Sequence, residues 1–182
     1  MIYVALLRGI NVGGKAKVEM SRLKGVFEQL GYNNVVTYIN SGNVIFESLS
    51  GSRQKIAKDI DDALESKFGF NIKVILRTHK ELGNLVMQIP DTWVNNDVMK
   101  CDVMFLMEEI DNPAILKRIP HNPQAEDVIY LPGAVVWRID RSKIRQGQVL
   151  KITGSDIHKR LTVRNPNTVR KILATMQDAA GD

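Results

Sequence analysis

The chain has 182 residues, 44% of them hydrophobic, and a formal net charge of +5. This composition can bury a substantial core and excludes a disordered chain, and the length fits one domain or two small ones. The longest apolar run, Ile2 to Leu7, ends at Arg8, which excludes a transmembrane span and a secretory signal peptide. The single cysteine, Cys101, cannot form an internal disulfide and favours a reducing compartment. We therefore expect a soluble, cytoplasmic protein without a membrane partner.

The charge is unevenly distributed along the chain. Residues 78–140 hold five basic and ten acidic residues, whereas residues 141–171 hold nine basic residues and one acid, Asp156. Charge segregated in this way predicts a surface that attracts an anion at one place. Nucleic acid is one such anion.

The pattern of residues 1–77 is that of a ferredoxin-like unit. A buried strand is predicted over 2–7, a helix over 20–30, a hairpin of strands over 35–39 and 44–47, a helix over 56–68 and a strand over 70–76. This βαββαβ order is the ferredoxin-like motif.

The second half shows a related pattern after a connecting region. Thr78 and Glu81 form a capping box that opens a helix, and residues 91–100 read as an irregular connection. A strand over 103–107, a helix starting near Pro113 and a turn over 131–134 between two strands follow. A basic connection and helices, the last capped by Asn165, complete the chain. We predict an α+β fold of two ferredoxin-like units with antiparallel sheets, βαββαβ over 1–77 and βαββ-α over 101–182, joined by 78–100.

A glycine-rich loop follows the first strand. Residues 9–15 match the spacing G-x-x-x-x-G-K of a phosphate-binding loop, but the next residue is Ala16, where a hydroxyl is needed to bind magnesium. The βαββαβ order is also not a parallel nucleotide-binding sheet, so an ATPase is excluded. A weaker interpretation remains, in which backbone N–H groups of the loop bind an anion that Arg8, Lys15 and Lys17 neutralise. The alternative is a mobile, solvated connection.

The predicted strand order extends this candidate site. The first and third strands of a ferredoxin-like sheet are antiparallel neighbours, so we expect Arg8 and Asn43 to lie at the same end of the sheet. The candidate anion-binding residues are Arg8, Gly9, Asn11, Gly13, Gly14, Lys15, Lys17, Asn40, Ser41 and Asn43. Against this, Asn and Ser also close turns by bonding their own backbone.

The sequence contains a weaker second candidate and no catalytic constellation. Arg164, Asn165 and Arg170 surround a predicted helix start, whose N–H groups favour anions, although Asn-Pro is an ordinary way to begin a helix. The three histidines, His79, His121 and His158, lack the spacing of metal ligands, so no metal is predicted, and the sequence leaves any cofactor unknown. An RNA-recognition mode is disfavoured because the third strand begins Asn-Val-Ile where stacking aromatics are needed.

Several motifs resemble a known family. The segments Leu7-Arg8-Gly9-Ile10-Asn11-Val12-Gly13-Gly14, Lys17-Val18 with Met20, and Ser41-Gly42-Asn43-Val44 closely resemble the domain of unknown function 1697 family. The segment Thr162–Val169 is similar to its C-terminal signature, but the family usually has tryptophan where this chain has Pro166. The resemblance implies a bacterial protein of two ferredoxin-like units, and it implies no activity, substrate or cofactor.

The leading hypothesis is a non-enzymatic module that binds an anionic ligand, nucleic acid or a nucleotide, through the Arg8–Lys17 loop with help from the basic C-terminal region. One alternative is an enzyme that acts on a small phosphorylated or carboxylated metabolite held by Arg8 and Lys15. Another is a scaffold for protein interactions, which large exposed apolar patches would support.

Overall fold

The computed structural model describes residues 1–11, 16–49 and 51–180. Within these residues the strands form two four-stranded sheets. Contacts divide the chain into a first unit, residues 1–82 with the C-terminal segment from Ile172, and a second unit, residues 83–171. The division falls inside α3 (His79–Gln88) and α5 (Pro166–Ala180), so each of these helices contributes residues to both units. None of the described helices combines the length and the apolar character needed to cross a membrane.

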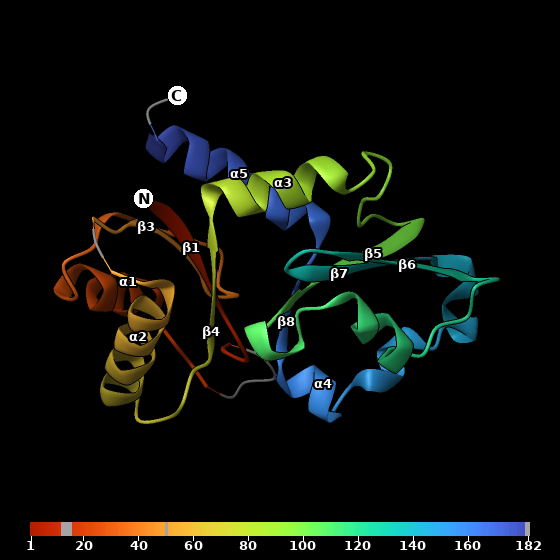
Figure 1. Ribbon diagram of the computed structural model, residues 1–182, viewed down its shortest axis with the longest axis horizontal. Helices are drawn as coiled ribbons and strands as arrows, with labels where there is room; N and C mark the ends of the chain where they lie inside the picture. Colours follow the sequence, from red (N-terminus) through yellow and green to blue (C-terminus); the bar gives the residue numbers. More distant parts are fainter. Residues whose placement is uncertain (12–15, 50, 181–182) are drawn as a thin grey trace. The chain divides into compact units, whose positions relative to one another are not determined.

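The first unit has the ferredoxin-like order. Its elements are β1 (Ile2–Leu7), α1 (Met20–Gln29), β2 (Asn33–Tyr38), β3 (Asn43–Glu47), α2 (Arg53–Phe68) and β4 (Val74–Thr78) (Figure 1). The strand order is β2-β3-β1-β4, and β1 is antiparallel to both β3 and β4. Residues Tyr3 to Leu7 are all buried, which confirms a central strand buried on both faces.

The helices α1 and α2 cover one face of this sheet (Figure 1). Alternate residues of β1 point to that face, and residues three or four apart along each helix meet them, so strand and helix periods together form one cluster. At its centre the Phe46 ring lies 5.2 Å from that of Phe27 and 4.6 Å from that of Tyr32, measured between ring centroids. Aromatic contacts of this kind stabilise the core beyond the burial of their area.

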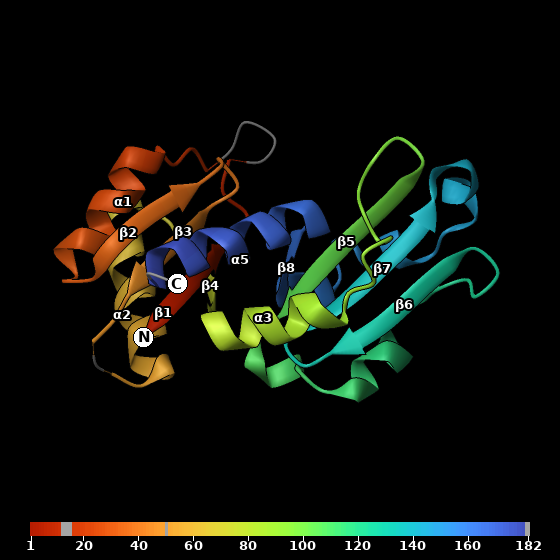
Figure 2. The same cartoon turned by 90° about the horizontal axis from the view of Figure 1, so that it is seen from above.

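The second unit repeats the strand order. Its strands are β5 (Met99–Leu106), β6 (Glu126–Leu131), β7 (Ala134–Asp140) and β8 (Leu161–Arg164), and their order is β6-β7-β5-β8. Figure 2 shows β5, β7 and β6 side by side. In both units the first strand of the sequence therefore lies between the third and the fourth. The prediction of two ferredoxin-like units with antiparallel sheets is confirmed.

Helical segments of the second unit differ from the prediction. The helix predicted to start near Pro113 is a 3-10 helix, η2 (Pro113–Arg118), and Asn112 caps it by accepting the Ala114 N–H at 3.1 Å. Another 3-10 turn, η1 (Glu108–Ile110), precedes it. The basic connection contains η3 (Arg141–Gln146) and η4 (Val149–Ile152), followed by α4 (Asp156–Lys159). The repeat is therefore clearest in the sheet.

The strand β8 was not predicted, and its absence made the second unit βαββ-α. It has four residues and pairs with β5, where Leu161 lies opposite Leu106 and Val163 opposite Met104. Four residues carry too little alternation to be separated from the flanking helix signals, and the pairing is with a distant segment. Tertiary contacts therefore define this strand.

Two capping predictions are confirmed. Glu81 N–H donates to the Thr78 hydroxyl at 3.2 Å, and the Glu81 carboxylate accepts the Thr78 N–H at 2.8 Å, which completes the capping box. The Asn165 side chain accepts the Thr168 N–H at 2.9 Å at the start of α5. These local signals needed no information from the rest of the fold.

Candidate functional site

The end of β1 lies beside the β2–β3 hairpin, as the strand order predicted. Leu6 is paired with Asn43, and the Leu7 N–H donates to the Gly42 carbonyl at 2.8 Å. Gly42 has a φ of 77°, and a Cβ there would lie 2.6 Å from Cδ1 of the buried Ile10. Only glycine permits this close packing. The hairpin and the residues after β1 are therefore in direct contact.

Asn11 joins the two ends of the loop to the hairpin. Its Oδ1 accepts the Val18 N–H at 2.8 Å, and its Nδ2 donates to the carbonyls of Val18 and Asn40, both at 2.9 Å. Its own N–H donates to the Ala16 carbonyl at 3.1 Å, and its φ of 55° is in the left-handed region, which Asn tolerates. Asn11 therefore holds the base of the loop. Gly13, Gly14 and Lys15 lie outside the described residues.

The hairpin residues of the candidate site close the turn. Asn43 is fully buried, and its Nδ2 donates to the Tyr38 carbonyl at 2.8 Å and to the Ser41 hydroxyl at 3.1 Å. Asn40 is exposed and offers its carbonyl to Asn11. Gly9 is exposed with a φ of 73°. The buried Asn43 amide stabilises the turn, whereas Asn40 and Gly9 lie at the surface.

Lys73 also lies in this region, although the candidate site predicted from the sequence did not include it. The Arg8 N–H donates to the Lys73 carbonyl at 2.9 Å, because β1 ends where β4 begins, with Leu7 opposite Val74. Lys73 is exposed, and its Nζ lies 3.6 Å from a carboxylate oxygen of Asp61. The ferredoxin-like order also makes β1 and β4 neighbours, but the strand was predicted over 70–76, which put Lys73 inside the strand rather than directly before β4 (Val74–Thr78).

Arg8, Lys17 and Lys73, with Asn11 and Asn40, are called the sheet-end cluster below. Lys17 is exposed between Ala16 and Val18, and Asn11 bonds both of these neighbours. Asp61 is paired with Lys73, and desolvation raises its pKa while Lys73 acts in the opposite direction. The three basic residues of the cluster outnumber this one acid. The cluster can therefore attract an anion.

The C-terminal candidates have separate structural roles in the second unit. Arg164 is 7% exposed, donates to the Thr162 hydroxyl at 3.0 Å and the Val163 carbonyl at 2.8 Å, and has its pKa lowered to about 10 by desolvation. Asn165 caps α5. Arg170 donates to the carbonyls of Trp93 and Pro90, both at 3.1 Å. The side chains of Arg164, Asn165 and Arg170 thus all bond to other groups of the protein.

Cys101 and the histidines provide no nucleophile or metal centre in the described part of the chain. Cys101 is fully buried, and desolvation, with Asp102 adding to it, raises the pKa of its thiol to about 12. A thiol of that pKa is not a nucleophile at neutral pH, and Cys101 packs as a small buried hydrophobic residue. Across residues 1–11, 16–49 and 51–180, no three His, Cys, Asp or Glu side chains gather closely enough to hold a metal ion.

Comparison with known proteins identifies the family. The family model described as "Protein of unknown function (DUF1697)" matches residues 1–137. The chain belongs to this family. The match includes the whole N-terminal loop and its hairpin, and it ends before the Thr162–Val169 segment. The family inferred from the sequence is confirmed, whereas the likeness of Thr162–Val169 to its C-terminal signature lies outside the match.

A solved structure shares the fold of the DUF1697 chain. It is the conserved bacterial protein SP0830 from Streptococcus pneumoniae, which is 25% identical, with a TM-score of 0.84 over 96% of this chain and 98% of that chain. No curated protein matches the chain. Family and fold are thus established without an activity.

Proposed function

We propose that the first unit binds a phosphate-bearing anion, nucleic acid or a nucleotide, at the sheet-end cluster, with no chemical step. The observation that carries the proposal is the 2.9 Å bond from the Arg8 N–H to the Lys73 carbonyl, because it brings the backbone of a second basic residue beside that of Arg8. Lys17 is linked to the same end of the sheet through Asn11, which bonds both of its neighbours. Basic residues that lie together can neutralise phosphate groups. Such binding releases counterions, so its affinity falls as the salt concentration rises. Asn11 supports the proposal by holding the base of the loop in one place.

The basic connection of the second unit supports a polymeric ligand. Lys143, Arg145 and Lys151 are exposed, and the one acid of residues 141–171, Asp156, lies 3.3 Å from a guanidinium nitrogen of Arg160. These cations give the second unit a basic surface of its own. A basic surface of this kind suits a polyanion such as nucleic acid. The expected cytoplasmic location belongs to the same proposal.

Binding of labelled oligonucleotides tests the function. Fluorescence anisotropy of single-stranded DNA, duplex DNA and RNA at about 50 and 200 mM salt should show affinity falling steeply as salt rises. The double variant Lys17→Ala/Lys73→Ala should lower the slope of log affinity against log salt by about 2, since each phosphate contact contributes roughly 1. Thermal shifts with mononucleotides, measured in parallel, separate a nucleotide ligand from a polymer.

A matched variant controls for net charge. Lys24→Ala/Lys67→Ala removes the same charge from exposed positions on α1 and α2 of the same unit. We expect this control to change the salt slope much less than the cluster variant does. Equal effects of the two variants, or no oligonucleotide or nucleotide binding at the lower salt, would show that the sheet-end cluster is not the site.

A further inference from the structure

The helix-covered face of the second sheet is incompletely filled. In the first unit, the connection from the third to the fourth strand is the 16-residue helix α2. In the second unit, the same connection supplies the four-residue elements η4 and α4. A cavity of about 70 Å³ remains between these short elements and the sheet. It is lined by Asp102, Met104, Trp137, Val149, Leu150, Ile152, Thr153, His158, Leu161 and Val163.

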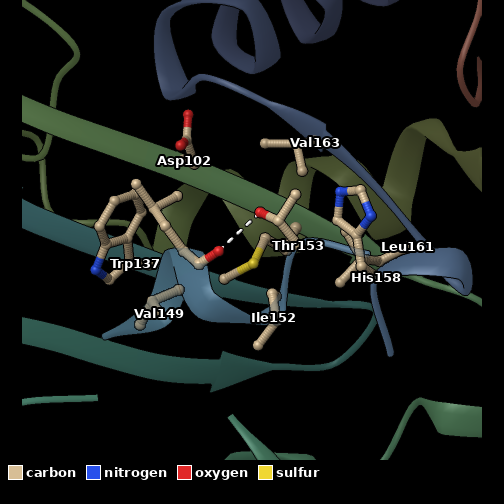
Figure 3. Close-up of a pocket in the computed structure, with 10 residues that line it drawn as sticks. Asp102, Trp137, Val149, Ile152, Thr153, His158, Leu161 and Val163 are labelled. Atoms are coloured by element: carbon tan, nitrogen blue, oxygen red, sulfur yellow. Dashed lines mark hydrogen bonds between the residues drawn. The ribbon is translucent and has the colours of Figure 1, made fainter. Parts of the chain in front are cut away.

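The walls of this pocket are mainly apolar. Figure 3 shows Asp102 and Trp137 at one end, His158 and Leu161 at the other, and Thr153 between them. The strand pairing agrees, because Asp102 lies opposite Trp137 while Leu161 pairs with Leu106, four residues farther along β5. That separation corresponds to about 13 Å along a strand. The pocket is therefore elongated.

The pocket opens to solvent beside two aliphatic side chains. Leu150 is 49% exposed and Val163 is 38% exposed, although both belong to the lining. Covering the apolar surface at the mouth of a cavity with an apolar ligand lowers the free energy, because that surface is removed from water. The volume, however, is smaller than the roughly 150 Å³ cavity that admits benzene. A slender aliphatic group fits, and a larger ring does not.

A buried carboxylate holds the helical wall of the pocket in place. Glu126 is 3% exposed and accepts the Trp137 indole N–H at 3.0 Å and the N–H groups of Gln148 and Val149 at 2.8 and 3.1 Å. Both the sheet residue Trp137 and the start of η4 are thus bonded to one side chain. The pocket is preformed, because these bonds need no ligand.

The charged groups around the pocket favour an anion. The carboxylate of Asp102 is neutralised by Lys100, whose Nζ lies 2.9 Å away. Lys151 stands between two lining residues of η4, Lys159 follows His158, and neither exposed lysine has an ion pair among the described residues. His158 Nδ1 accepts the Gly154 N–H at 3.3 Å, which leaves its ring proton on Nε2 when neutral. Asp156 of α4 is paired with Arg118 and Arg160, so the charged residues around the pocket remain net positive.

We propose that this pocket binds a small organic anion with a slender aliphatic body, such as a short-chain carboxylate. The aliphatic body lies against Met104, Trp137 and Leu161, and the carboxylate is directed towards the side of Lys151 and Lys159. All these residues belong to the second unit, so the proposal is independent of the sheet-end cluster of the first unit.

A matched set of ligands tests the pocket. Pentanoate, pentanol, pentylamine and acetate would be titrated into ¹⁵N-labelled full-length protein, and amide shifts of residues 149–163 followed by NMR. Pentanoate should bind with a dissociation constant on the order of millimolar, as expected for so few atoms. Pentanol and acetate should bind several-fold more weakly, and pentylamine most weakly. Equal affinity for pentanoate and pentanol, or shifts confined to other residues, would overturn the proposal.

Two variants separate the apolar and the charged parts of the site. Val163→Phe fills the mouth while keeping a strand-forming residue on an edge strand, and it should abolish the pentanoate shifts. Lys151→Glu/Lys159→Glu should weaken pentanoate at least several-fold and strengthen pentylamine. The charge-matched control Lys143→Glu/Arg145→Glu should leave pentanoate affinity unchanged, because η3 contributes no lining residue. Unaltered pentanoate binding in Val163→Phe, with the fold confirmed by the amide spectrum, would also overturn the proposal.

Discussion

In the first unit, α2 covers the sheet with Ile56, Ile60 and Leu64, which recur at the spacing of one helix face. In the second unit, the same connection is divided into η3, η4 and α4, and the buried carboxylate of Glu126 fastens it to the sheet. The strand order is nevertheless the same in both. The comparison shows that the same strand order can be covered by different helical segments. The long helix packs through its apolar face, whereas the short segments are held by several hydrogen bonds to one buried carboxylate.

The largest loss of stability is expected from changing Glu126, the buried carboxylate that holds the short helical segments of the second unit on its sheet. Glu126→Gln turns one acceptor of the buried side chain into a donor, facing N–H groups of Asn122, Trp137, Gln148 and Val149. Buried donors without acceptors cost about 1–3 kcal/mol each, so we expect the free energy of unfolding to fall by about 3 kcal/mol.

Urea unfolding followed by tryptophan fluorescence measures this loss. Both tryptophans, Trp93 and Trp137, lie in the second unit, so the signal reports the unit that contains Glu126. The control Glu109→Gln alters an exposed carboxylate of the same unit and should change stability by less than about 0.5 kcal/mol. A similar small change in Glu126→Gln would mean that the carboxylate is dispensable and that the comparison between the units is wrong.

A smaller loss of unfolding free energy is expected from Gly147→Ala, because this glycine packs against Glu126. A Cβ at Gly147 would lie 2.9 Å from Glu126 Oε1 and 3.0 Å from Ile139 Cδ1. The φ of −68° suits alanine, so the loss is steric and should amount to about 1–3 kcal/mol. Urea unfolding measures it.

A glycine of the first unit provides a control in which the same substitution should raise the stability. Gly25 lies in α1, and a Cβ there would meet nothing within 4 Å. Gly25→Ala should therefore stabilise the first unit by about 0.5–1 kcal/mol, because alanine favours a helix over glycine. If Gly147→Ala were also neutral or stabilising, tight packing would not hold the short connection.

The smallest effect concerns the capping box of the first unit and depends on pH. Burial alone would raise the pKa of Glu81, but hydrogen bonds from Arg53 and Thr78 outweigh it, and the net pKa is lowered. A lowered pKa in the folded state means that the carboxylate stabilises the protein above its unfolded pKa of 4.5 and loses this contribution as the pH falls through the folded value.

Unfolding at pH 7 and at pH 3 checks this contribution. Glu81→Gln should cost no more than about 1 kcal/mol at pH 7, since the side chain is partly exposed and solvent screens it. The cost should shrink at the lower pH. Glu28→Gln, which alters a surface pair with Lys24, should show a weaker pH dependence. An equal cost of Glu81→Gln at both pH values would exclude ionisation as the cause.

Local patterns in the sequence determined most elements of the first unit and both caps. The alternation of β1, the helical spacing of α1 and α2, and the Asn-Ser-Gly-Asn turn each depend on neighbours in the chain, so they could be predicted. The position of the end of β1 beside the hairpin at Asn43 also followed, because the βαββαβ order implies the pairing of the first and third strands. The side-chain positions of the anion site did not follow, and its function remains a prediction.

Only the tertiary structure decided the features that connect distant segments. The bond of Asn11 to Asn40, the pairing of β8 with β5 and the four hydrogen bonds to Glu126 join residues that carry no common local signal. The pocket beside η4 has the same origin, since it is the space that short helices leave over a sheet. Sequence periodicity indicates which face of an element is buried, whereas the packing of elements decides which polar groups meet and where a cavity remains.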